Sequence, residues 1–351
     1  MSPENLLLGV EFLAVCIVII VASIYIQLFR KKRHYFYTSN INRHLENWIS
    51  HILLEESAEG IQLPAKFYRI LRNPAARVYA IDELVKCKKN FSGTVAETVV
   101  QLYTQLGLKK DSLKKLSSRK WYVKARGIQE LYLMDQMDVL KTIYKNTNNR
   151  HEFVRMEAQT GIIYLSGFPG LRFLDVISYP LTEWQQIKLL EQLRLTPQKQ
   201  DLTEFIPRWL QSKNDTVVVF ALKLADEYQL FAIIDDVVDC LVHPSDRVRT
   251  QAVKTLVKLA DHNTPGILLG YFRKEKFTNR SLMLDALATM ATEAQTDILL
   301  SLLDEENNII KLKAAIVLAN CSPNGMGLLE QRAISEPEPY LRILKHVKSV
   351  K

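Results

Sequence analysis

Residues 245–260 read "SDRVRTQAVKTLVKLA", an amphipathic stretch whose apolar residues recur at helical spacing. Its skeleton is V-R-x-x-A-x-x-x-L, carried by Val248, Arg249, Ala252 and Leu256. The same slots are filled one period earlier and one period later along the chain, by Val217, Ala221, Asn279, Arg280 and Leu287. A single helix needs a period of 3.6 and has no reason to repeat at 31. The stretch is therefore one unit of a longer internal repeat.

Repeat starts run through most of the chain at a regular spacing of 31, with one interval of 32: Ser92, Val123, Val154, Gln185, Val217, Val248, Asn279, Ile310 and Leu341. In six of these nine units the slot after the start is basic. A period of 31 holds two helices of about 12 residues and two short turns. Residues 230–242 and 266–275 are predicted second helices, and Pro207 is expected to kink or shorten the second helix of its unit.

This skeleton, with an acid or amide just before the start, resembles HEAT repeats, in the short variety also found in phycobilin lyases. The resemblance implies a ladder between adjacent units, formed by an acid and the basic residue that follows it; here these are Asp246 with Arg249 and Glu152 with Arg155. We call the position of Arg249 in the skeleton the basic slot and the position of Ala252 the small-residue slot. The unit that starts at Gln185 departs from the pattern, because it lacks the basic residue and has Leu189 in the small-residue slot. A change of curvature is expected there.

The N-terminal segment reads as a membrane anchor. Residues 12–29 carry no charge, and at 1.5 Å per residue they cover about 27 Å, close to the thickness of a bilayer core. The anchor is marked by Phe12, Ile19, Ile26 and Phe29. A cleavable signal peptide is the alternative, but the positive charges follow the apolar run instead of preceding it.

The basic flank Arg30, Lys31, Lys32 and Arg33 predicts the orientation. By the positive-inside rule the N-terminus lies outside and the rest of the chain lies in the cytoplasm. Glu11 is interpreted either as a residue at the outer headgroups or as a contact to another membrane helix. A bacterial inner membrane is the expected setting, by analogy with other anchored repeat proteins.

Together these patterns predict an all-α protein, with a transmembrane helix followed by a right-handed α-solenoid of HEAT-like helix pairs. The expected divisions are the transmembrane helix at 1–30, a basic juxtamembrane segment and helical cap at 31–90, and the solenoid at 91–351. Stacking is required because one helix pair cannot bury its apolar face alone.

No nucleotide-binding, zinc-protease or nucleophile-elbow motif is present in the sequence, so no catalytic residue, cofactor or metal site is predicted. Asp235, Asp239 and His243 line one helix face, which is interpreted as a solvated acidic face sooner than as a metal site. The four cysteines are far apart and form no C-x-x-C pair, which fits a reducing compartment.

A basic patch stands out between residues 109 and 126: Lys109, Lys110, Lys114, Lys115, Arg119, Lys120, Lys124 and Arg126. It is interpreted as a solvated helix face, as a contact to anionic lipid or an acidic partner, or, less favoured, as a grip on nucleic acid. Trp121 and Trp184 lie near first-helix starts, where they would serve either as partner anchors or in packing.

The leading function is a membrane-anchored, non-enzymatic scaffold or adaptor whose solenoid binds a protein partner at the membrane. An envelope polysaccharide synthase or a signalling protein is the expected kind of partner. Two alternatives stay open. One is an enzyme similar to bilin lyases or HEAT-like DNA glycosylases; the other is a peripheral structural protein that binds anionic lipid. The oligomeric state is left undetermined by these patterns.

Overall fold

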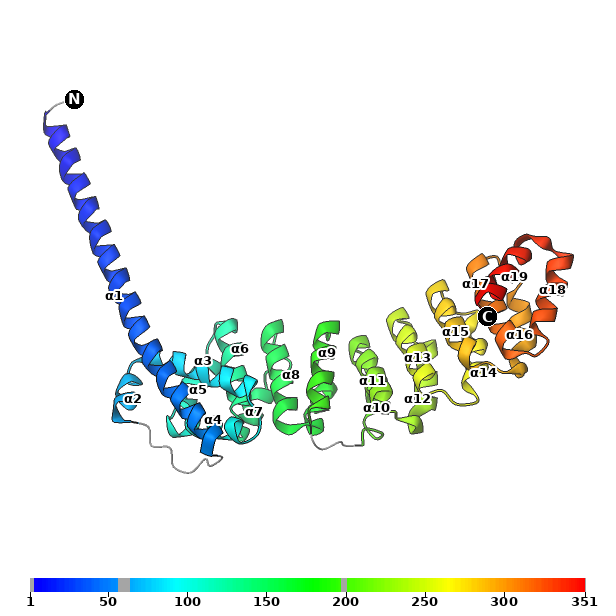
Figure 1. Ribbon diagram of the computed structural model, residues 1–351, viewed down its shortest axis with the longest axis horizontal. Coiled ribbons are helices and arrows are strands. Elements are labelled where there is room, and N and C mark those ends of the chain that lie inside the picture. The colour runs from blue at the N-terminus through cyan, green and yellow to red at the C-terminus, as the bar shows by residue number, and fades with distance from the viewer. Residues whose placement is uncertain (1–2, 56–63, 197–200, 351) are drawn as a thin grey trace. The chain divides into compact units, whose positions relative to one another are not determined.

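The computed structural model describes the backbone of residues 3–55, 64–196 and 201–350 and the side chains of residues 12–50, 64–196 and 201–349. Over this part of the chain the regular elements are all helices, and no strand is present. The prediction of an all-α fold is therefore confirmed. One long helix with an apolar part precedes a series of helix pairs (Figure 1).

The chain forms two compact units, residues 1–170 and residues 171–351, called unit 1 and unit 2 below. The helices of unit 1 are α1 (Pro3–Glu55), α2 (Ala65–Ile70), α3 (Pro74–Asn90), α4 (Gly93–Gln105), α5 (Lys109–Leu116), α6 (Trp121–Leu133), η1 (Met137–Val139), α7 (Leu140–Tyr144) and α8 (Glu152–Ser166). The 3-10 helix η2 (Phe168–Asp175) crosses the boundary.

Unit 2 continues with the same alternation of first and second helices. Its elements are α9 (Glu183–Arg194), α10 (Ile206–Leu210), α11 (Asp215–Glu227), η3 (Phe231–Ile233), α12 (Ile234–Asp239), η4 (Cys240–Val242), α13 (Asp246–Lys258), α14 (Thr264–Phe272), α15 (Phe277–Met290), η5 (Glu293–Gln295), α16 (Thr296–Leu302), α17 (Asn308–Cys321), α18 (Gly325–Ser335) and α19 (Pro337–Val350).

The repeat starts predicted from the sequence coincide with the first helices. Seven of them, from Val123 to Ile310, are each the third residue of a helix. Ser92 is the N-cap of α4, and Leu341 lies inside α19. The period found in the sequence is therefore the spacing of the first helices.

The second helices are shorter than the predicted length, which was that of a typical helix. The predicted helix at 230–242 is divided into η3, α12 and η4, and the one at 266–275 corresponds to α14, which ends at Phe272. Pro207 stands in the first turn of α10, which spans only Ile206–Leu210. Short 3-10 segments occur where one or two turns must fit between longer helices.

Small side chains in the first helices let neighbouring first helices approach closely. Ala221 of α11 and Ala252 of α13 are fully buried, and these two helices run close together. Between α6 and α8, a Cβ atom at Gly161 would lie 2.5 Å from Cδ1 of Tyr132. Because no larger residue fits at that point, this close approach requires glycine.

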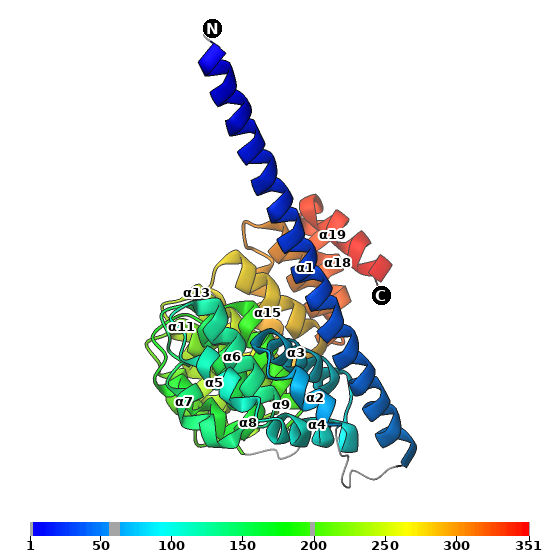
Figure 2. The same ribbon diagram turned by 90° about the vertical axis from the view of Figure 1, so that its left-hand side faces the viewer.

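The long helix α1 does not break at residue 30, where the sequence suggested a division. It continues to Glu55, and its last part enters the core of unit 1 (Figures 1 and 2). There Ile41, Leu45 and Trp48 are buried with residues of α2, α3 and α4, such as Phe67 and Ile81. The apolar part of α1 and the body of unit 1 are thus joined by continuous helix.

Candidate functional site

The predicted anchor residues lie on the exposed surface of α1. Phe12, Ile19, Ile26 and Phe29 are all more than half exposed. By length and composition alone, the segment Phe12–Ser50 contains a window apolar enough to cross a membrane, with a mean hydropathy of 2.7. The basic flank that follows is also exposed, and the side chain of Glu11 lies outside the described residues.

The basic patch is divided between paired and unpaired cations. Lys115 and Arg126 both form ion pairs with Glu130, whose side chain is only 2% exposed. Ser112 donates a hydrogen bond of 2.7 Å to the same carboxylate, and Lys109 pairs with Asp138. The remaining cations form no ion pair within the described part of the chain: Lys110, Lys114, Arg119, Lys120 and Lys124. The charges of this second set are the ones that no ion pair offsets within the described residues.

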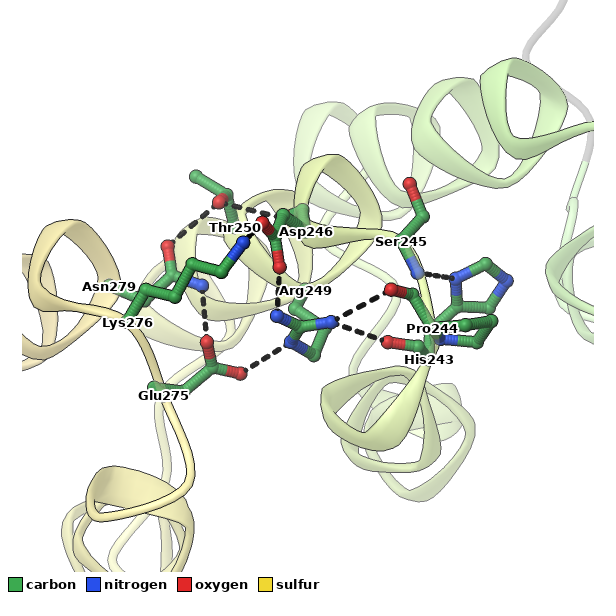
Figure 3. A network of polar contacts seen from close by, with 9 residues as sticks. All are labelled: His243, Pro244, Ser245, Asp246, Arg249, Thr250, Glu275, Lys276 and Asn279. Atoms are coloured by element: carbon green, nitrogen blue, oxygen red, sulfur yellow. Dashed lines mark hydrogen bonds and ion pairs between the residues drawn. The ribbon is translucent and has the colours of Figure 1, made fainter.

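Arg249 closes the turn that precedes its own helix (Figure 3). Its Nη1 donates to the carbonyl oxygens of His243 and Pro244, at 2.8 and 3.1 Å. Its Nε donates at 2.8 Å to Glu275, whose side chain is 2% exposed and lies just before the next first helix. Arg249 therefore connects two successive repeat units.

Asp246 takes part in the same network. It pairs with Arg249 within α13 and with Lys276 from the turn before α15 (Figure 3). These hydrogen bonds, that of Lys276 first, lower the pKa of Asp246. The pair that the family resemblance implied as a ladder, Asp246 with Arg249, thus lies within one helix, and the contacts between units run instead from Arg249 to Glu275 and from Asp246 to Lys276.

Other units use the basic slot in the same way. Arg155 of α8 donates to the carbonyl oxygens of Asn149 and Arg150, at 2.9 and 3.1 Å, while Glu152 is exposed in the first turn. Arg280 of α15 lies 2.6 Å from Glu305, before the following first helix. The basic slot therefore serves the packing of the repeats.

The unit that starts at Gln185 differs from the other units described above at two positions, the basic slot and the small-residue slot. Gln186 occupies the basic slot and is buried, and its amide donates to the carbonyl of Leu181 at 3.3 Å. Leu189 occupies the small-residue slot and is fully buried. The backbones of α9 and α11 scarcely approach each other, whereas α11 and α13 run close together. The wider spacing thus occurs in the unit where a leucine, whose side chain needs more room, replaces the small residue.

A groove of about 840 Å³ opens at this wider spacing, across the first helices α9, α11 and α13. Its polar side chains include Gln186 of α9, Lys223 of α11 and Lys254 of α13. Lys223 donates a hydrogen bond of 2.8 Å to Oε1 of Gln186. Lys223 and Lys254 take the same slot in successive units, six positions after their repeat starts. Two successive first helices thus present a lysine to one groove.

Lys223 forms no ion pair within the described residues, although two acids, Glu183 and Asp215, also line the groove. Its recorded partner is a neutral amide, and burial lowers the pKa of its ammonium group. The nearby charge of Glu183 acts against this, and that of Lys254 acts with it. Glu183 also lies 3.3 Å from Arg247 at the exposed rim. A partly desolvated cation beside a second lysine suits a carboxylate ligand.

Within residues 12–50, 64–196 and 201–349 no group of three His, Cys, Asp or Glu side chains is placed to hold a metal ion. Asp235, Asp239 and His243 are the residues weighed above as a metal site. In the structure the imidazole of His243 makes a hydrogen bond within a turn. Nδ1 of His243 accepts a hydrogen bond from the backbone N–H of Ser245, at 3.1 Å. His243 thus belongs to the turn that Arg249 closes.

The sequence pattern predicted none of the groove lysines. A tabulation of the sixth position after each repeat start would have shown Lys223 and Lys254 as two lysines in successive units.

The two tryptophans near first-helix starts, Trp121 and Trp184, are both exposed, at 42% and 68%. Trp48 and Trp209 are the ones buried in the core.

No protein-family model matches the chain, and no curated protein does. Solved structures that are similar include an engineered protein, with 13% identity and a TM-score of 0.39, covering 84% of this chain and 92% of that one. The complex of CpcE and CpcF of phycocyanin lyase from Nostoc sp. PCC7120 has 14% identity and a TM-score of 0.25, covering 84% and 97%. Microtubule polymerases with TOG domain arrays, which recruit tubulin, have 14% identity and a TM-score of 0.26, covering 76% and 71%.

Proposed function

We propose that this chain is a membrane-anchored scaffold without enzymatic activity. In this proposal α1 crosses the membrane once with its N-terminus outside, and the helix pairs bind a protein partner in the cytoplasm. The partner inserts a segment that carries carboxylate side chains into the groove across α9, α11 and α13. A multi-span envelope enzyme, such as a polysaccharide synthase, or a signalling protein would fit such a role at the membrane.

The observation that carries the proposal is the pair of lysines in this groove. Lys223 is held by the oxygen of Gln186 and by no carboxylate within the described residues, so its positive charge is open to a ligand. A carboxylate that bridges Lys223 and Lys254 would relieve the cost of burying the first lysine. The groove is lined by three successive first helices, and this extent suits a peptide segment.

The exposed apolar part of α1 supports the membrane location. Its side chains are exposed from Phe12 onward, and a water-exposed surface of this kind would be unfavourable for an isolated protein in water. The basic flank from Arg30 to Arg33 supports the cytoplasmic location of the helix pairs.

The test uses the full-length protein in detergent and a fluorescent peptide rich in glutamate. We expect the peptide to bind, and we expect Lys223→Gln and Lys254→Gln each to weaken binding by about tenfold, as for loss of a hydrogen bond to a charged group. The matched control is the double variant Lys213→Gln, Lys258→Gln, which removes two exposed lysines of unit 2 outside the groove. An equal loss of peptide affinity in the groove variants and in the control variant would refute the role of the groove.

A second measurement addresses the natural partner. Affinity capture from detergent-solubilised membranes should recover a protein with the wild-type bait and lose it with the variant K223Q/K254Q. Recovery of the bait alone, or equal recovery with both baits, would overturn the proposed binding mode.

A further inference from the structure

An exposed aromatic cluster lies where α6 and α8 begin. The rings of Trp121 and His151 stack with centroids 4.3 Å apart, and the ring of Phe153 stacks at 5.3 Å from that of Trp121. Tyr122 contacts Trp121 edge-on at 5.7 Å. Tyr122 and Phe153 are both 53% exposed. The cluster packs against itself and leaves large aromatic surfaces uncovered, which marks a binding surface.

Four cations lie close to these rings in the sequence. Arg119 and Lys120 precede Trp121, and Lys124 and Arg150 stand nearby in sequence at the start of α6 and before α8. None of the four forms an ion pair within the described part of the chain. One acid, Glu152, lies in the same region. We call this surface the aromatic–cation edge; its residues are Arg119, Lys120, Trp121, Tyr122, Lys124, Arg150 and Phe153.

The position of α1 relates this edge to the membrane segment. The body of unit 1 begins directly after the basic flank, because the His34 ring lies 6.3 Å from Tyr79 of α3 and the Tyr79 hydroxyl donates at 2.8 Å to Asn42. Helix α3 is joined to α6 by the ion pair of Asp82 with Arg126. In Figure 1 the upper end of α6 stands a little below the middle of α1, on the side toward which the apolar part extends.

We propose that the aromatic–cation edge rests on the anionic headgroup surface of the membrane that α1 enters. The proposal goes beyond the scaffold function and rests on one part of it, the insertion of α1. Because α1 is continuous from its apolar part to the core of unit 1, contact at the edge adds a second attachment point. Two attachment points fix the tilt and rotation of unit 1 on the bilayer, which a single helix cannot do.

The composition of the edge favours lipid over a protein partner. Trp and Tyr are enriched where proteins meet the headgroup layer, since their rings combine an apolar body with a polar group. Lysines and arginines near an anionic surface gain attraction that adds up charge by charge. With four cations and one acid, the edge is complementary to such a surface.

The test measures the depth of Trp121 in the full-length protein reconstituted in nanodiscs. Lipids brominated near the top of the acyl chain quench tryptophans at headgroup level. We expect quenching in discs with anionic lipid, and we expect Trp121→Phe to remove most of it. Trp184→Phe is the matched control, because Trp184 is the other exposed tryptophan and lies in unit 2, outside the edge. Equal loss in both variants, or none in Trp121→Phe, would overturn the proposal.

Charge variants test the electrostatic part. The double variant R119Q/K120Q should lower the quenching of Trp121 and its dependence on anionic lipid. The control K110Q/K141Q removes two exposed lysines at the N-terminal ends of the second helices α5 and α7, neither of which forms an ion pair within the described residues. An equal effect of both pairs would contradict a specific contact.

Failure of this inference is distinguishable from failure of the scaffold proposal. Extraction of native membranes with alkaline carbonate reports whether α1 is inserted. If the protein is released by carbonate, the anchored scaffold itself is wrong. If it is retained while Trp121 is not quenched, only the contact of the aromatic–cation edge is wrong.

Discussion

The first helices α9 and α13 are built on the same slots and differ at two of them. In α13 the basic slot holds Arg249 and the small-residue slot holds Ala252, and the helix packs closely on α11. In α9 the same slots hold Gln186 and Leu189, and the helix stands away from α11 with a groove beside it. Two altered slots in one repeat unit therefore accompany the change from a closely packed pair of helices to an open groove.

The change at the basic slot also explains why the groove accepts lysines. An arginine at position 186 would place a second cation next to Lys223, whereas Gln186 offers a neutral oxygen that accepts its hydrogen bond. An arginine in this slot is engaged by acids elsewhere, as Arg249 is by Glu275. The neutral residue leaves Lys223 without an ion pair within the described residues, and the nearby charge of Glu183 offsets its positive charge only in part.

The largest effect is expected for Arg249→Met. It leaves the carboxylate of Glu275, 2% exposed, without its charged partner, so we expect a loss of about 3–5 kcal/mol in the free energy of unfolding. Denaturant titration of the protein in detergent measures it. Arg247→Met is the control two positions away: its ion pair with Glu183 is about three-quarters exposed, and we expect a change of less than about 1 kcal/mol. Similar losses of unfolding free energy in both variants would show that the buried ion pair of the basic slot stabilises the protein no more than an exposed ion pair does.

Leu189→Ala tests the other altered slot. Removing a fully buried leucine should cost about 2–5 kcal/mol, depending on how far α9 moves toward α11 to fill the space. If α9 does move, the groove narrows, and binding of the glutamate-rich peptide should weaken as well. A stability loss with unchanged peptide binding would show that Leu189 fills the core without setting the width of the groove.

Ala252→Leu is the reverse change in the closely packed pair. Because Ala252 is fully buried, the larger side chain must push its neighbours apart or strain their packing, which should cost about 1–3 kcal/mol. Thermal unfolding of this variant and of Leu189→Ala gives the two costs side by side. A neutral Ala252→Leu variant would mean that the spacing of first helices is not controlled by this slot.

The smallest effect is the pH dependence at Lys223. Burial lowers the pKa of this group below 10.5, its ordinary value, so the unfolded chain binds its proton more tightly than the folded one. Between the two pKa values the unfolded state carries more protons, and stability should rise with pH in that window. We expect Lys223→Gln to reduce this rise, as measured by denaturant titrations on the alkaline side of neutrality. A slope that is the same in both proteins would contradict the burial of the charged amine.

The spacing of the first helices was predictable from the sequence because it is a local property. Apolar residues at helical spacing, a small residue and a basic residue recur in most units, and each start from Val123 to Ile310 lies at the same point of a helix. The apolar character of α1 was equally evident, since it depends on composition alone. The lengths of the second helices were not predictable, because packing between longer helices decides how many turns fit.

The site was accessible to sequence reasoning only in part. The departure of the unit at Gln185 was visible as two unusual residues, and the structure shows its physical consequence in the wider spacing of α9 and α11. The basic patch was visible as a run of charges, but its division was not: Lys115 and Arg126 meet Glu130, while Arg119 and Lys120 stay free within the described residues. Which charged residues form ion pairs depends on which helix faces pack against each other, and the sequence pattern does not show this.

The sequence by itself thus determined the period, the class of fold and the apolar N-terminal helix, since each follows from patterns within one helix or one unit. Only the tertiary structure decided that Lys223 and Lys254 share a groove, and that Trp121, His151 and Phe153 stack at one edge. These contacts join residues that lie a full repeat apart in the chain. They depend on the distance between packed helices, which is set by the volumes of the buried side chains between them.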